Sequence, residues 1–129
     1  MKQIVITSGD LILEGTLNDT PTAETVYKTL PIEGKANRWG DEIYFEIPCD
    51  IGLEDDAREI VEPGDLGYWP TGKAFCIFFG RTPVSTDARP RAYSPVNVFG
   101  RIRGDIGVLR NVAQGDKVMV RRDEFALGG

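Results

Sequence analysis

A single apolar run limits the folds that this sequence can adopt. Residues 73–80 read KAFCIFFG. Apolar side chains occupy both alternating sets of positions in this run, Phe75, Ile77 and Phe79 in one set and Ala74, Cys76 and Phe78 in the other. Successive side chains of a strand point to opposite faces of its sheet, so both faces here must be covered. A closed β-barrel does this, because one face fills the interior and the other lies under a helix, a loop or a partner chain.

The segments before this run predict a hairpin, a helix and two more strands. Apolar and polar residues alternate on both sides of the turn Ser8-Gly9-Asp10, which predicts an N-terminal hairpin. Thr20 and Pro21 are typical of a helix start, and apolar residues follow at helical spacing before a stop at Pro31. These apolar residues are Ala23, Val26, Tyr27 and Leu30.

Residues 31–48 predict two antiparallel strands around the turn Gly40-Asp41. In the second strand Ile43, Phe45 and Ile47 share one face, and Tyr44 and Glu46 share the other. The acidic segment 49–65 predicts an irregular crossing with a brief strand around Ile60 and Val61.

The segments after the run complete a mostly-β pattern. Residues 81–95 hold three prolines and no apolar periodicity, so we expect a long surface loop. A strand over 95–104, a short helix within 104–112 and a closing strand over 116–125 follow, with Val118 and Val120 on one face of the last strand. This order fits a β-barrel capped by helices.

Composition limits the cellular location, the partners and the cofactors that we expect. The length of 129 residues suits one domain over 1–129, and neither a membrane-length apolar run nor a secretion signal is present, so we expect a cytoplasmic protein with no membrane partner. Cys49 and Cys76 fit no metal or redox spacing. The net charge of -5 disfavours nucleic acid, and the absence of histidine removes the commonest proton shuttles and metal ligands, so we expect no cofactor and no metal.

Several stretches resemble cyclophilins. Residues 20–48, with a Thr-Ala-Glu helix and a strand that ends at a proline, and residues 96–112, VNVFGRIRGDIGVLRNV, are similar to cyclophilin segments. Residues 64–83, GDLGYWPTGKAFCIFFGRTP, followed by YSPVNVFGRI at 93–102, resemble a family of small prokaryotic cyclophilin-like proteins of uncharacterised function. The resemblance implies a mainly β fold, a closed cyclophilin-like barrel with one amphipathic helix after the first hairpin and a short helix before the last strand.

The same resemblance argues against prolyl isomerisation. Cyclophilins hold the substrate proline with an arginine on the strand before that terminal proline, where this chain has Phe45, or Glu46 with a one-residue shift. Neither residue donates a charge-assisted hydrogen bond as arginine does. The cyclophilin glutamine falls near Ala74, and the pocket tryptophan falls in the proline-rich loop. We therefore expect the scaffold without an active isomerase.

Two groups of residues are candidate ligand-binding positions. Tyr68 and Trp69 lie in a turn and either anchor a ligand or plug the end of the barrel, and Tyr44 and Glu46 share the strand face on which cyclophilins bind peptide. Arginines around the long loop could converge on a carboxylate or phosphate, or else be solvated counter-charges. They are Arg81, Arg89, Arg91, Arg101 and Arg103.

Three functions follow from these residues. The first is a non-catalytic module that binds a peptide or a small anionic molecule between the aromatic residues and the arginine loop. The second is an isomerase-like or amide-processing enzyme with an altered site, with Glu46, Tyr44 or Asp65 as proton donors. The third is a subunit whose two-sided strand 74–79 is covered by another chain, so that a monomer and a homodimer both remain open.

Overall fold

The computed structural model describes residues 2–124. Along the chain the elements are β1 (Gln3–Ser8), β2 (Leu11–Leu17), α1 (Pro21–Thr29), β3 (Ile32–Lys35), β4 (Asn37–Arg38), β5 (Glu42–Glu46), β6 (Arg58–Ile60), β7 (Asp65–Trp69), β8 (Ala74–Phe78), β9 (Arg91–Arg103), the 3-10 helix η1 (Ile106–Asn111) and β10 (Lys117–Arg122). The fold is mainly β, as the sequence predicts. Within these residues no helix has both the length and the apolar character needed to cross a membrane.

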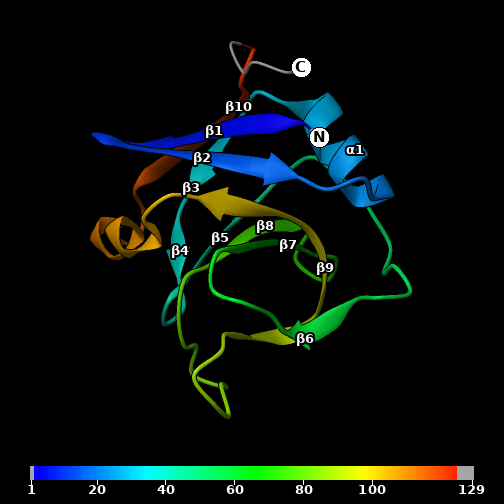
Figure 1. Cartoon of the computed structure of the whole chain (residues 1–129), viewed down its shortest axis with the longest axis vertical. Helices are drawn as coiled ribbons and strands as arrows, with labels where there is room; N and C mark the ends of the chain where they lie inside the picture. Colours follow the sequence, from blue (N-terminus) through cyan, green and yellow to red (C-terminus); the bar gives the residue numbers. More distant parts are fainter. Residues whose placement is uncertain (1, 125–129) are drawn as a thin grey trace.

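The strands form one antiparallel sheet. Their order is β3-β10-β1-β2-β9-β7-β8-β5-β4, and β6 pairs with β9 beside this path (Figure 1). The hydrogen-bonded path has two ends, β3 and β4, which follow one another in the chain and are joined through Ala36. The closed barrel therefore stays a prediction, whereas the antiparallel sheet itself is confirmed.

The helix α1 begins and ends where the sequence predicts. The Thr20 hydroxyl accepts a hydrogen bond from the backbone N–H of Ala23 at 3.2 Å, and Pro21 starts the first turn. Ala23 and Val26 are buried, which anchors the helix, and α1 contacts β9. The second expected helix is present as η1, a 3-10 helix capped by the Asp105 side chain.

Side chains pack on both faces of the sheet. One face carries the main core, a large cluster that includes Phe45, Phe75 and Phe99. The other face carries a smaller second core, which consists of Val61, Ala74, Cys76, Phe78, Ala92 and Val96, with Tyr44, Trp69 and Val98 packed against it. All five residues of β8 are buried, because the chain itself covers both faces of this strand. A partner chain is not needed to cover it.

A β-bulge changes which side chains of β9 point to each face of the sheet. Leu66 pairs with Gly100, but the next residue, Gly67, pairs with Val98. Phe99 is therefore an extra residue of β9 that has no partner on β7. Phe99 stays in the main core, and Val96 and Val98 face the second core. A Cβ on Gly67 would lie 2.9 Å from Val96, so the missing side chain allows this close approach.

The long loop is shorter than expected. Residues 91–94 belong to the start of β9 rather than to a surface loop, because they pair with β6 at Arg91–Ile60. The brief strand expected at Ile60 and Val61 is β6, Arg58–Ile60. The closing strand ends at Arg122, and its expected end at Phe125 lies outside the described residues.

Candidate functional site

A cavity opens on the face of the sheet that carries the second core. It has a volume of about 170 Å³ and is lined by Trp39, Glu42, Tyr44, Trp69, Ala92, Tyr93 and Val96. We call this set the aromatic pocket. Glu42 and Tyr44 come from β5, Trp69 from the end of β7, and Ala92, Tyr93 and Val96 from β9, while Trp39 precedes the turn into β5.

Four aromatic rings form the wall of the aromatic pocket. Three pairs have centroids 6.2 Å apart, and their ring planes are inclined at 70°, 76° and 81° in the order Trp39–Tyr93, Trp69–Tyr93 and Tyr44–Trp69. These edge-to-face contacts connect the four rings in the order Trp39, Tyr93, Trp69, Tyr44. Tyr93 is 72% exposed, so this wall of the pocket borders solvent.

The Trp69 ring is fixed from two sides. Its indole N–H donates a hydrogen bond to the Ser94 hydroxyl at 2.6 Å, which ties β7 to β9 at the pocket. Gly72 lies against the ring, because a Cβ at this position would lie 2.6 Å from two ring carbons. The ring orientation is therefore set by neighbours and does not depend on a ligand.

The turn that carries Trp39 and Glu42 is also fixed. The backbone N–H of each residue donates to the carbonyl of the other, at 3.0 and 3.2 Å. Gly40 has a φ of +60°, and a Cβ there would lie 2.9 Å from the Arg81 carbonyl oxygen, so glycine suits this turn. The Arg38 guanidinium donates to the Gly40 carbonyl and closes the turn from outside the pocket.

Glu42 is a buried carboxyl group in the aromatic pocket. The residue is only 5% exposed, and its Oε1 atom has no hydrogen-bond partner among the described residues. Burial raises the pKa of Glu42 from 4.5 to about 7, and the interaction with the neighbouring Cys76 thiol acts in the opposite direction. Burial also raises the pKa of Cys76 well above its ordinary value, so that thiol stays neutral. The site therefore holds one carboxyl group that titrates near neutral pH.

The comparisons with known proteins decide the family. The profile of the family described as Cyclophilin-like matches residues 2–121, nearly the whole chain. The chain belongs to the cyclophilin-like family. It is similar to the solution structure of a hypothetical protein from Archaeoglobus fulgidus, with 40% identity, a TM-score of 0.78 and 94% of each chain covered. No curated protein matches the sequence.

This cyclophilin-like chain has no arginine at the isomerase position. Phe45 lies in the main core, 1% exposed and stacked on Phe75 with ring centroids 5.1 Å apart, on the opposite face of β5 from Tyr44. Glu46 is exposed at the end of β5 and does not line the aromatic pocket. The lining residues include neither arginine nor lysine. No arginine or lysine therefore takes its place in the aromatic pocket.

Tyr68 does not belong with Trp69. The sequence suggests an aromatic pair, but alternate residues of β7 face opposite sides, and Tyr68 is completely buried in the main core. Its hydroxyl donates to the Cys49 carbonyl at 2.6 Å and accepts from the Ile51 N–H at 3.2 Å. Tyr68 thus anchors the segment after β5, and its burial favours the second alternative of the sequence prediction, a hydrophobic plug, over a ligand-binding residue.

The arginines do not converge. Arg91 pairs with Glu59 at 2.9 Å, Arg101 pairs with Asp65 at 2.6 Å, and Arg103 pairs with Glu14. Arg81 donates to the Ser85 carbonyl at 3.4 Å. The pairing with Arg101 also occupies the Asp65 carboxyl, one of the expected proton donors. None of the five arginines lines the aromatic pocket.

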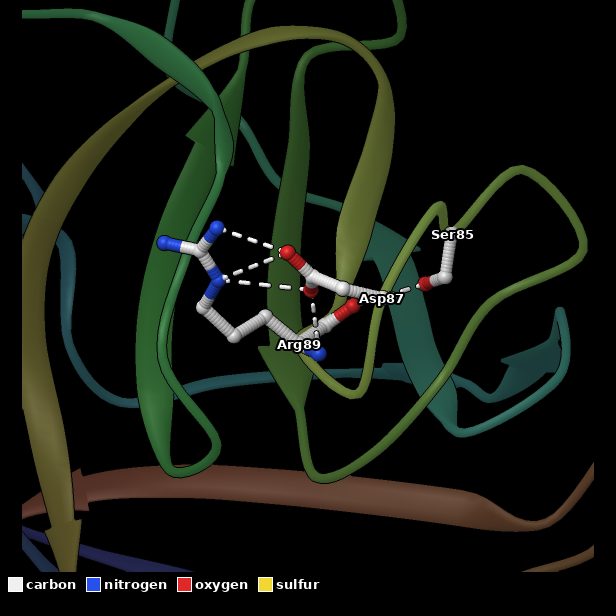
Figure 2. A network of polar contacts seen from close by, with 3 residues as sticks. All are labelled: Ser85, Asp87 and Arg89. Carbon is white, nitrogen blue, oxygen red and sulfur yellow. Dashed lines mark hydrogen bonds and ion pairs between the residues drawn. The ribbon is translucent and has the colours of Figure 1, made fainter.

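Arg89 folds back on its own loop. Figure 2 shows its guanidinium facing the Asp87 carboxylate, with a shortest N–O distance of 2.7 Å. These hydrogen bonds lower the pKa of Asp87 to about 2. The Ser85 hydroxyl donates to the Arg89 carbonyl at 2.8 Å and completes this local loop structure. The guanidinium is therefore already matched by a carboxylate.

Sequence reasoning found two of the seven lining residues, Tyr44 and Trp69. It missed Trp39, Glu42, Ala92, Tyr93 and Val96. One signal for Glu42 was present, because it has the same parity on β5 as Tyr44 and Glu46. The residues of β9 gave no such signal, since their facing depends on the strand pairing.

Proposed function

We propose that this chain is a non-catalytic binding module and that the aromatic pocket holds the ligand. The observation that carries this proposal is the group of four aromatic side chains around one cavity, three of them only partly buried and Tyr93 exposed. Pockets lined by aromatic residues with one or few polar groups are typical of ligand sites. The lack of a cationic hydrogen-bond donor in the lining argues against prolyl isomerisation at the same place.

The size of the pocket limits what enters it. Small-molecule sites usually span roughly 300–1,000 Å³, and this cavity has about 170 Å³. A small molecule, or one side chain of a peptide, fits this volume better than a drug-sized ligand. The buried carboxyl of Glu42 and the paired arginines speak against the anionic ligand that the sequence suggested.

We also infer that the sheet closes into the barrel expected of the family. Gly34 on β3 packs on Phe45 of β5, since a Cβ there would lie 2.8 Å from the phenyl ring. The two ends of the hydrogen-bonded path thus approach each other across Ala36. This closure would fix the curvature of the face that carries the aromatic pocket.

The two tryptophans of the chain provide the test. Both line the aromatic pocket, so tryptophan fluorescence reports on this site alone. We expect members of a panel of small amines, alcohols, carboxylates and short peptides to change the emission in a saturable way. Tyr93→Ala should weaken the response, and Ile12→Ala, which removes an exposed apolar side chain outside the pocket, should not. A panel without any saturable response would refute the proposal.

A second function is supported by Glu42. A carboxyl group with a pKa of about 7 in a pocket is suited to general acid–base catalysis, and it replaces Glu46, Tyr44 and Asp65 as the proton donor of an amide-processing enzyme. A coupled prolyl-isomerase assay and a hydrolysis assay on cyclic amides test this function. Turnover that is lost in Glu42→Gln would establish it in place of simple binding.

A further inference from the structure

We propose that the aromatic pocket binds the head of an organic cation, an alkylated ammonium group that keeps at least one N–H, with Glu42 as its counter-ion. This inference rests on the proposed binding function and names the class of ligand. It depends on three features of the pocket: an unpartnered carboxyl oxygen, the aromatic wall, and the absence of any protein cation in the lining.

The first feature is the unsatisfied oxygen of Glu42. Buried polar atoms in proteins nearly always have hydrogen-bond partners, and leaving one without a partner is unfavourable. Oε1 of Glu42 has none among the described residues, although the side chain lines a cavity. A ligand that donates a hydrogen bond in this cavity would supply the partner. A charged donor would do so most strongly, because the acceptor is a carboxyl group.

The second feature is the aromatic wall. The faces of aromatic rings carry partial negative charge and attract cations within about 6 Å of the ring centre, and groups of such rings are used to bind alkylated ammonium ions. Adjacent rings in this pocket are inclined by 70° to 81°, so they surround the cavity instead of forming one stack. The same faces repel an anionic ligand, and so does the ionised carboxyl group of Glu42 beside them.

The third feature is the lack of a counter-charge from the protein. The seven lining residues include neither lysine nor arginine, and the sequence has no histidine. The nearby Arg38 is occupied outside the pocket, where it donates to backbone carbonyl groups and pairs with Asp41 at 3.6 Å. The cation that matches both Glu42 and the rings therefore has to come from the ligand.

These features also select among cations. A quaternary ammonium ion would satisfy the rings but has no N–H for Oε1. A metal ion would need several oxygen ligands, and the described residues contain no group of three or more acidic or cysteine side chains that could hold one. An ammonium group with one to three alkyl substituents satisfies both the rings and the oxygen, and such a head group fits the volume of about 170 Å³.

Binding of this cation would be coupled to the ionisation of Glu42. The titratable groups that face Glu42 are the Cys76 thiol on β8 and the phenols of Tyr44 on β5 and Tyr93 on β9, none of which is cationic. Burial holds the pKa of Glu42 near 7 in the free protein, and an ammonium ion beside it would lower this pKa. We therefore expect proton release on binding at neutral pH, which calorimetry in buffers of different ionisation enthalpy measures.

The test uses three probes that share an isopropyl group and differ in charge. Isopropylammonium, 2-propanol and isobutyrate are titrated into the whole protein at constant ionic strength, and tryptophan fluorescence is recorded. We expect a saturable response to isopropylammonium, a response at least roughly tenfold weaker to 2-propanol, and none to isobutyrate. Tetramethylammonium should bind more weakly than trimethylammonium, because it lacks the N–H.

Matched variants locate the charge. Glu42→Gln should weaken isopropylammonium binding by roughly tenfold or more and abolish the proton release. Glu46→Gln, which removes the same charge from the same face of β5 outside the pocket, should leave both unchanged. Thermal melts of both variants establish that each is folded, and Glu42→Gln removes a buried charge and keeps the side-chain shape.

The outcomes separate this inference from the proposed function. The proposal of a cationic ligand is wrong, and the binding function stands, if 2-propanol or isobutyrate binds as tightly as isopropylammonium. The same conclusion follows if Glu42→Gln binds the ammonium ion with unchanged affinity. If no probe of any charge gives a saturable response, both fail. The affinity for a short peptide with one dimethyl-lysine is compared with the affinity for free dimethylammonium, to distinguish the source of the head group. Much tighter binding of the peptide indicates a protein partner, and equal affinities indicate a small amine.

Discussion

Replacing Glu42 by glutamine should stabilise the protein, and more so as the pH rises. Burial raises the pKa of this carboxyl from 4.5 to about 7, so between these values the native state binds more protons than the unfolded state. The free energy of unfolding then falls as the pH rises through this range, and the penalty is fully present above pH 7. At about 1.4 kcal/mol per pH unit, the shift corresponds to about 3 kcal/mol.

Urea unfolding followed by circular dichroism measures this effect. The difference in the free energy of unfolding between Glu42→Gln and the wild type should grow by about 2 to 3 kcal/mol from about pH 5 to about pH 8. The amide has the same shape as the carboxyl group but does not titrate, so other groups cancel in the comparison. Glu46→Gln, with its exposed side chain, is the control and should show no such growth. A difference for Glu42→Gln that stays constant with pH would refute the reasoning, because the carboxyl would then be hydrated in the native state.

Three further predictions concern the surroundings of the pocket. Gly72→Ala should displace the Trp69 ring, because its Cβ would lie 2.6 Å from two ring carbons, and a changed fluorescence spectrum with several-fold weaker probe binding would reveal this. Tyr68→Phe should lower the free energy of unfolding by about 1 to 2 kcal/mol, because the buried Cys49 carbonyl loses its hydrogen-bond donor, and it should leave probe binding unchanged. Weaker probe binding with an unchanged free energy of unfolding would contradict the assignment of Tyr68 to the main core. Arg89→Ala should change neither the thermal midpoint nor probe binding measurably, because the Arg89–Asp87 pair is exposed and screened by solvent; a loss of ligand affinity would place the arginine loop in the site after all.

Local sequence signals predicted most of the fold. The cap at Thr20, the apolar spacing up to Leu30 and the turn after Ser8 each depend on neighbouring residues, and each has its expected structure. The two-sided apolar run of β8 also gave correct information, because burial on both faces requires only that something covers them. The sequence could not show that Val61, just after β6, and the start of β9 supply part of that cover.

The site was harder to predict because it depends on distant contacts. Glu42 follows a turn, and a charged residue in this position is normally exposed. Its burial depends on Trp39 and on Tyr93, which lies far along the chain and beyond two prolines that suggested a loop. Tyr68 and Trp69 show the opposite case, since simple alternation along β7 already assigns them to different faces.

The extra residue in β9 has a consequence for how related chains are compared. If Phe99 is deleted, the bulge is lost but every preceding residue keeps its partner and its facing, because Val98 already pairs with Gly67 and Asn97 with Tyr68. If Val98 is deleted and the bulge is kept, the preceding part of the strand turns over, so that Asn97 moves to the face of the aromatic pocket and Val96 to the main core. Loss of the Val98 codon would thus exchange an apolar pocket residue for an amide, with every lining residue still encoded, whereas loss of the Phe99 codon would not. When a related chain has one residue fewer in this strand, the gap therefore has to be placed on the correct side of Phe99 before its pocket residues are compared with those of this chain.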